Sequence, residues 1–294
     1  MRSKNRQKLK NVVYVNGYFV DGYDNHISLM DRGFNLADGI FETMVAHVNR
    51  IFSIDDHFER LYESARVLSI DMPAPDKIKS ILYESIKQNE LEYCVLRLTI
   101  TRGVDHNRGL EVHECTEPSI TVRVVPWDGP ATELPRGKKL CFSSIIRNEF
   151  SPLSNIKSLS YTEAVIARHE AQKTGFDDAL LLNTKHVVTG ATSSNVFVVM
   201  GGKIITPSLS DGVLPGIARS KIIELCASMD IIVLEKSITK THIEYSEESF
   251  ISNVVTGITP ISVIEGAYVA QNPVGSLTKQ IFEAYRDRLL RELS

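Results

Sequence analysis

The sequence predicts a two-domain α+β fold, and three observations lead to this prediction. The chain has 294 residues, which is enough for two domains of average size. Its first half mixes strand-like and helix-like patterns. A stretch rich in proline and glycine, from Pro126 to Gly137, then separates this half from a second mixed half. We expect a smaller N-terminal α+β domain over residues 1–127, a linker over 128–137 and a larger C-terminal α/β domain over 138–294.

The elements of the N-terminal half follow from local patterns. Asn16-Gly17 is a strong hairpin signal between two short apolar runs, 12–15 and 18–20. Residues 41–48 are typical of a strand. Apolar residues recur at helical spacing over 54–68, and 76–88 fits a second helix. Residues 93–102 alternate between apolar and polar, which predicts a half-buried strand, and 119–125 predicts another.

The C-terminal half predicts strands near 139–147, 178–183, 195–200, 203–206, 231–236 and 249–255. Helices fit 158–174, 216–229 and 276–292. Ligand clefts are common at domain interfaces, so we expect the functional site between the two domains.

Composition excludes several classes of function. The net charge of -3 gives no sign of a nucleic-acid or membrane partner. The four cysteines are scattered, which favours reduced thiols and a cytoplasmic location; they are Cys94, Cys115, Cys141 and Cys226. The histidines show no metal-ligand spacing, and Asp55-Asp56-His57 is better explained as an acidic helix start. We expect no metal.

Two glycine-containing segments have the composition of ligand-binding loops. The stretch 189–195 gathers small hydroxyl residues in a turn before a strand, and such a turn can offer N–H groups and hydroxyls to a phosphate or a ring oxygen. The stretch 214–219 opens a helix, where exposed N–H groups form an anion site. From these residues alone, a plain connecting loop and an uncontacted helix start remain equally open.

Four further segments belong with these two. In chain order the six are Asp31-Arg32-Gly33-Phe34 with Ala37 to Glu42, His57 to Leu61, Ile156 to Tyr161, Gly190 to Phe197, Leu214 to Arg219 and Ser252 to Pro260. In this order, and over a stretch from about residue 13 to 266, they resemble the class IV aminotransferases, the fold type IV pyridoxal-phosphate enzymes. That family includes branched-chain aminotransferases, D-amino acid aminotransferases and aminodeoxychorismate lyases.

The resemblance implies a role for each matching residue. Lys157 would bond covalently to the aldehyde of pyridoxal 5'-phosphate and then move the α-proton of the substrate. Tyr161 would hydrogen-bond the ring oxygen of the cofactor. Arg60 would hold its phosphate, since a guanidinium presents paired donors. The remaining implied cofactor contacts are Gly190, Ser193, Ser194, Asn195, Ile217, Ala218, Val254 and Val255.

One of these positions departs from the family pattern. Gly190 stands where the family usually has a glutamate, whose carboxylate keeps the pyridine nitrogen of the cofactor protonated. A protonated ring is the stronger electron sink. Ala218 and Val254 also replace residues that often carry hydroxyls. The sequence therefore supports cofactor binding more directly than efficient catalysis.

The substrate side leaves three functions open. Arg102 and Arg108 are candidates to bind a substrate carboxylate, with surface arginines as the equal alternative, and Phe41 replaces a tyrosine that often lines the pocket. The first function is an aminotransferase acting on a branched-chain or D-amino acid and a 2-oxo acid. The second is aminodeoxychorismate lyase, which releases pyruvate. The third is a cofactor-binding relative with weak activity. The resemblance also implies a homodimer.

Overall fold

The computed structural model describes residues 10–24, 26–113, 117–265, 267–268 and 275–294. The chain forms two compact units. One contains the residues up to Gly129 together with Glu292–Ser294, and the other runs from Pro130 to Arg291. The division lies within the stretch 128–137 that the sequence predicts as a linker.

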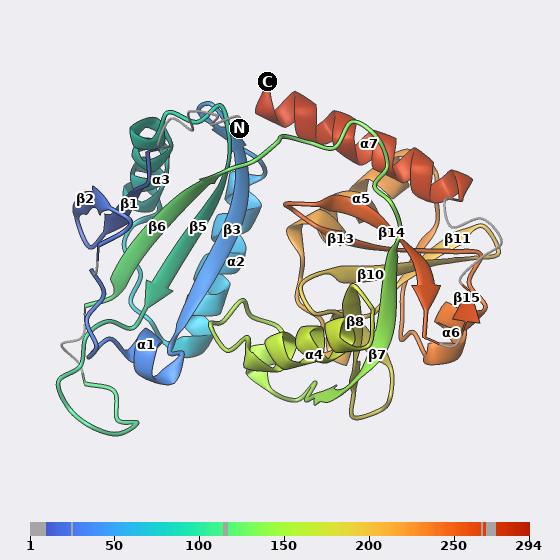
Figure 1. The fold of residues 1–294 in the computed structure, drawn as a ribbon, viewed down its shortest axis with the longest axis horizontal. Coiled ribbons are helices and arrows are strands. Elements are labelled where there is room, and N and C mark those ends of the chain that lie inside the picture. The colour runs from blue at the N-terminus through green and yellow to red at the C-terminus, as the bar shows by residue number, and fades with distance from the viewer. Residues whose placement is uncertain (1–9, 25, 114–116, 266, 269–274) are drawn as a thin grey trace, which may run out of the picture. The chain divides into compact units, whose positions relative to one another are not determined.

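The first unit is built on a six-stranded antiparallel sheet with the order β2-β1-β6-β5-β3-β4. Helices α2 and α3 pack against it (Figure 1). The strands are β1 Val12–Val15, β2 Tyr18–Asp21, β3 Gly39–His47, β4 Arg50–Ile51, β5 Tyr93–Thr101 and β6 Ser119–Pro126. The helices are α1 Arg32–Leu36, α2 Ile54–Leu68 and α3 Pro75–Asn89.

Helix α2 shows how the sequence determines one of these elements. Its apolar residues recur every three or four positions, so Phe58, Leu61 and Ala65 share one face and are buried in the core of the unit. The helix ends at Ser69, which adopts a left-handed conformation and donates its N–H to the carbonyl of Ala65. The predicted helix over 54–68 is confirmed.

The second unit contains a mixed sheet with the order β12-β11-β10-β13-β14-β7-β8-β9, and β15 pairs with β14. Its strands are β7 Lys138–Arg147, β8 Asp178–Asn183, β9 Val188–Ala191, β10 Asn195–Met200, β11 Lys203–Thr206, β12 Val233–Glu235, β13 Glu248–Asn253, β14 Gly257–Ile264 and β15 Ala267–Tyr268. Its helices are α4 Thr162–Lys173, α5 Ile217–Ser228, α6 Lys240–Glu244 and α7 Ser276–Leu293, with 3-10 turns η1 Pro152–Ser154 and η2 Leu209–Asp211.

Most predicted elements of the second unit are present, with shifted ends. Helix α4 begins at Thr162 rather than at 158, so the segment that carries Lys157 is not helical. The sequence analysis missed β9, because its Thr-Gly-Ala sequence lacks the bulky branched residues of a typical strand. It also missed β14, whose Gly257 start and internal proline resemble a loop.

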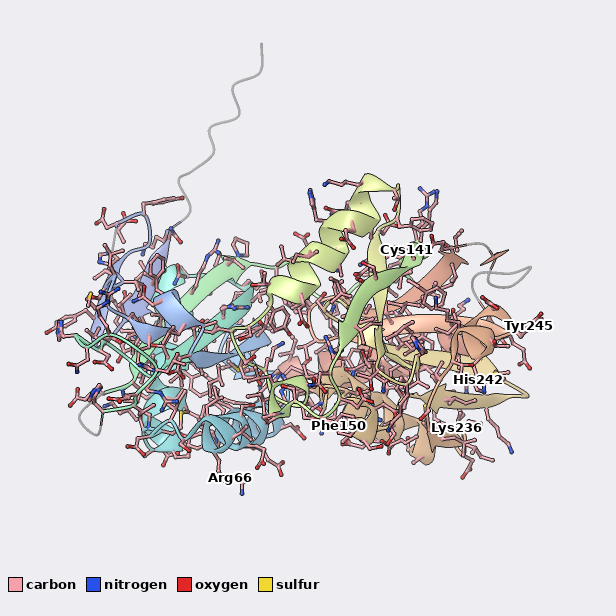
Figure 2. All side chains as sticks on the ribbon, turned by 90° about the horizontal axis from the view of Figure 1, so that it is seen from below. Arg66, Cys141, Phe150, Lys236, His242 and Tyr245 are labelled. Carbon is pink, nitrogen blue, oxygen red and sulfur yellow. The ribbon has the colours of Figure 1, made fainter. Side chains whose placement is uncertain are left out.

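The described cysteines are free and buried; they are Cys94, Cys141 and Cys226. Figure 2 shows Cys141, which lies on β7. Burial raises the pKa of the Cys94 thiol, and that of the Cys226 thiol, to about 11. Cys115 lies outside the described residues. In the described part of the chain, no helix combines the length and apolar character needed to cross a membrane.

Candidate active site

Lys157 lies in an irregular segment between η1 and α4. The preceding Ile156 is buried and anchors the segment in the core. Asn155 fixes its entry, because the side-chain amide donates to the carbonyls of Leu209 and Val213, at 3.0 Å each. The backbone of Lys157 is therefore held from both η1 and the η2 region, while its side chain remains partly exposed.

The amine of Lys157 meets the hydroxyl of Tyr161. Nζ donates to the tyrosine oxygen at 3.2 Å, and it lies 5.5 Å from the centre of the tyrosine ring. The last residue of β7, Arg147, is an electrostatic neighbour of Tyr161. Burial lowers the pKa of the Arg147 guanidinium, and the charges of Tyr161 and Glu163 oppose this. A cation here favours negative charge on an oxygen near Tyr161. The sequence analysis missed Arg147, because an arginine at a strand end carries no motif.

Gly190 is the last residue but one of β9, and residues 192–194 form the short connection from β9 to β10. Gly190 has φ of 155°, and a Cβ added there would lie 2.9 Å from the carbonyl oxygen of Ser194. The N–H of Ala191 donates to that same oxygen at 2.9 Å. The hydroxyl of Ser194 accepts from the amide of Asn253 at 3.1 Å. A side chain at position 190 would therefore strain the backbone of β9 and require the Ser194 carbonyl to shift.

The start of α5 supplies an anion site. Gly216 is its N-cap and has no side chain that could accept from the first backbone N–H groups of the helix. A Cβ on Gly216 would lie 1.9 Å from Oδ1 of Asn195, and the amide of Asn195 donates to the carbonyl of Leu214 at 3.0 Å. Asn195, at the start of β10, thus packs against Gly216 and holds the start of α5 in place. The N–H groups of Ile217 and Ala218 at this helix start are suited to bind a phosphate.

The turn after β13 is organised by Asn253. Its Oδ1 accepts from the N–H of Val255 at 3.0 Å and from the N–H of Thr256 at 2.8 Å. Val254 is buried. The backbone N–H of Val255 is thus already engaged inside the turn, and any contact that Val254 or Val255 makes with a cofactor stays a prediction.

The second unit therefore contains an amine, a phenol and a helix start without a side-chain cap. These donors fit the aldehyde, ring oxygen and phosphate of pyridoxal phosphate. Position 190, a glycine on β9, supplies no side chain for the pyridine nitrogen. Ser193, which is exposed, lies in the connection that follows β9.

In the first unit, Arg60 belongs to a buried ionic cluster. Its Nε and Nη2 donate to the two carboxylate oxygens of Glu42 at 2.7 and 2.6 Å, and Nδ1 of His57 lies 2.8 Å from Oε2. Burial raises the pKa of Glu42, but Arg60 and His57 outweigh burial and bring it to about 2. The carboxylate fixes the direction of the Arg60 guanidinium. The phosphate contact of Arg60 stays a prediction.

The residues predicted to bind substrate also lie in the first unit. Phe41 is buried, and the guanidinium of Arg97 stacks 3.5 Å from the centre of its ring. Arg97 is one of the polar positions of the alternating strand predicted over 93–102, and the sequence analysis gave it no role. Arg108 is exposed in the loop after β5.

Arg102 is committed to contacts within the unit. It is buried, with Nε and Nη2 on Asp38 at 2.7 and 3.0 Å, and it also donates to the carbonyls of Leu68 and Ser69. Burial raises the pKa of Asp38, but Arg102 and Arg32 outweigh burial and lower it. These contacts connect the end of β5 to the end of α2, so Arg102 has a structural role within the first unit.

Two α+β units, a lysine–tyrosine pair and a helix start suited to an anion are the features expected of a pyridoxal-phosphate enzyme of fold type IV. The family model for "Amino-transferase class IV" matches residues 39–264. The chain belongs to this family, whose members use pyridoxal 5'-phosphate. The described residues hold no group of three metal-binding side chains.

Relatives cover nearly the whole chain. The "Putative branched-chain-amino-acid aminotransferase" of Methanocaldococcus jannaschii is 32% identical and covers 94% of this chain and 95% of its own. The D-alanine aminotransferase of Bacillus licheniformis is 29% identical, with 95% and 98% covered. A solved branched-chain aminotransferase from Thermoproteus uzoniensis with norvaline has a TM-score of 0.87 at 27% identity, with 96% and 95% covered. The predicted family and two-domain α+β fold are confirmed.

Proposed function

We propose that this chain is an aminotransferase that moves an amino group between an amino acid, of the branched-chain or D-amino acid type, and a 2-oxo acid. The observation that carries the proposal is the 3.2 Å contact between the amine of Lys157 and the hydroxyl of Tyr161, on a segment held by Asn155. The relatives named for these activities support it over nearly their whole length.

Pyridoxal phosphate, when bound, supplies an aldehyde that reacts with amines and a ring that accepts electrons from the substrate. Lys157 would hold the cofactor through its amine, and its Nζ would take up and return the α-proton of the substrate. Tyr161, with Arg147 as its cationic neighbour, would orient and stabilise the ring oxygen. The N–H groups at Ile217 and Ala218 would hold the phosphate.

Lys157→Ala tests the proposal directly. The purified protein is incubated with pyridoxal phosphate, reduced with borohydride and digested, and the labelled peptide is identified by mass. We expect the label on the peptide with Lys157, and its loss in Lys157→Ala. Lys203→Ala is the matched control, because Lys203 is an exposed lysine of the same unit. A label that persists in Lys157→Ala would show that another lysine reacts.

Amino donors then separate the activities. L-valine, L-leucine and D-alanine are each supplied with 2-oxoglutarate, and we expect at least one donor to yield its 2-oxo acid in an amount equal to the glutamate formed. Pyruvate release from aminodeoxychorismate, without any acceptor, would instead identify the lyase. Labelling at Lys157 without either reaction would identify a cofactor-binding protein of weak activity.

A further inference from the structure

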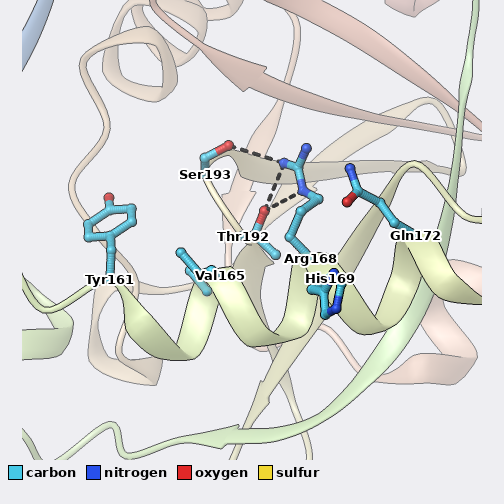
Figure 3. A pocket seen from close by; sticks show the side chains of 8 residues that line it. Tyr161, Val165, Arg168, His169, Gln172, Thr192 and Ser193 are labelled. Carbon is cyan, nitrogen blue, oxygen red and sulfur yellow. Dashed lines mark hydrogen bonds between the residues drawn. The ribbon is translucent and has the colours of Figure 1, made fainter.

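A second polar cluster lies near the Lys157–Tyr161 pair, on α4 and on the loop after β9. Arg168 donates to Oδ2 of Asp178 from Nη2 at 2.6 Å. It also donates to Oγ1 of Thr192 from Nε at 3.0 Å and from Nη2 at 2.8 Å (Figure 3). The hydroxyl of Thr192 in turn donates to Oδ1 of Asp178 at 2.6 Å. The three side chains form a closed ring of hydrogen bonds.

This ring fixes the guanidinium but does not use all of it. Asp178 is fully buried, and Thr192 is nearly so. The Arg168 side chain is 31% exposed, and its Nη1 makes no hydrogen bond to any described residue. A charged donor is therefore held rigidly in place with one nitrogen left over.

Arg168, whose Nη1 is the nitrogen left over, lines a pocket. Tyr161, Arg168, Thr192 and Ser193 all line one pocket of about 390 Å³, with further side chains of α4 (Figure 3). Tyr161 is the residue that contacts Lys157. The pocket thus shares a wall with the lysine–tyrosine pair, and it continues along α4 to Arg168.

The loop that carries Thr192 supplies no carboxylate to this region. At Gly190, which precedes it on β9, φ is 155° and a Cβ would lie 2.9 Å from the carbonyl of Ser194, so a side chain there would strain the backbone. The carboxylate of Asp178 is buried and already accepts from Thr192 and Arg168. Within the cluster of Arg168, Asp178 and Thr192, Arg168 is the charged group with a donor nitrogen left for a ligand.

We propose that Arg168 faces the pyridine nitrogen of the cofactor and donates a hydrogen bond to it from Nη1, so that this nitrogen binds without a proton. The inference rests on the proposed function. A guanidinium is a permanent cation with donors only, so its partner must offer a lone pair. Its positive charge also disfavours a second cation beside it.

The chemical consequence is a weaker electron sink. A ring nitrogen without a proton accepts less of the negative charge that forms when the α-proton leaves. The groups around Lys157 would then have to stabilise more of that charge. Asp178 and Thr192 are positioning residues here, because they act through Arg168. Asp178→Asn would loosen the guanidinium while leaving its charge in place.

Nitrogen-15 NMR of the protein loaded with ¹⁵N-pyridoxal phosphate tests the proposal. In the wild type we expect the chemical shift of an unprotonated pyridine across neutral pH. In Arg168→Gln we expect a shift toward the protonated value as pH falls. His169→Gln is the matched control, because His169 is the next residue of α4 and lines the same pocket; it should match the wild type. A protonated nitrogen in the wild type overturns the proposal, even where Arg168→Gln fails to fold.

A cofactor analogue with carbon in place of the pyridine nitrogen gives an independent measure. The wild type should bind this analogue roughly tenfold or more weakly than pyridoxal phosphate, the size expected for a lost charge-assisted hydrogen bond. In Arg168→Gln the two affinities should agree. Equal affinities in the wild type would contradict the proposal. Borohydride labelling of Lys157 is read on the same samples, so labelled protein with a protonated ring refutes the Arg168 contact alone, whereas unlabelled protein refutes the proposed function.

Discussion

Glu42→Gln should destabilise the first unit, and the size of the effect should depend on pH. The carboxylate of Glu42 is buried with Arg60 and His57. Its pKa falls from the ordinary 4.5 to about 2. A depression of this size corresponds to about 3 kcal/mol of stability from the ionised form. The amide would also leave the Arg60 guanidinium buried without its counter-charge, and breaking a buried pair costs about 3–5 kcal/mol.

The pH dependence follows from the direction of the shift. Because the pKa is lower in the folded protein, the stabilisation is fully present above the unfolded value of 4.5 and is lost as pH falls toward about 2. At about pH 3 roughly 2 of the 3 kcal/mol should be gone. The other acidic groups are shared by both proteins, so the difference between wild type and Glu42→Gln should shrink by that amount between about pH 7 and about pH 3.

Trp127 makes the measurement specific to the first unit. It is the only tryptophan of the chain, and it lies edge-on to Tyr93 with ring centres 5.8 Å apart. Urea unfolding followed by its fluorescence gives the free energy of unfolding at each pH. Glu59→Gln is the control, since Glu59 is an exposed residue of α2. A difference between wild type and Glu42→Gln that stays constant with pH would refute the assignment of the low pKa to Glu42.

Two further predictions concern residues that the sequence singled out. Arg102→Gln should lower the melting temperature measured by calorimetry, because it breaks the contacts with Asp38. Arg108→Gln should leave the melting temperature unchanged. A raised KM for the amino acid in Arg108→Gln would support binding of the substrate carboxylate by Arg108. Gly190→Ala should destabilise the protein by about 1–3 kcal/mol through backbone strain and contact with Ser194, as measured by urea unfolding followed by circular dichroism. An unchanged denaturation midpoint would contradict this reasoning.

The sequence predicted the elements whose signals are local. The helix over 54–68 has regular apolar spacing and appears with the same ends. Strand β5 alternates and appears as Tyr93–Thr101. Helix α1 was missed, because its five residues hold no apolar repeat. It forms because the carboxylate of Asp31 caps the N–H of Gly33 and the chain closes at Ala37 in a left-handed conformation.

The candidate site could be predicted only where a motif marks it. Lys157 and Tyr161 were found through the segment around them, and the structure brings their side chains together. Arg168 and Asp178 were not found, because ten residues separate them and neither belongs to a motif. Only the packing of α4 against β8 makes them partners. Arg102 has a recognisable sequence context, but the sequence could not reveal that Asp38 already occupies its donors.

The glycine at 190 and the arginine at 168 have to be considered together. A glutamate at 190 would need a new loop conformation, because a Cβ there meets the carbonyl of Ser194. If it were accommodated in the region that Arg168 is proposed to face, it would pair with the guanidinium and not with the cofactor. Gly190→Glu alone is therefore not expected to strengthen the electron sink. If Arg168 faces the ring nitrogen as proposed, a protonated ring would require both a different backbone at position 190 and the removal of Arg168. The glycine at 190 and the arginine at 168 would therefore act together to keep the ring nitrogen without a proton.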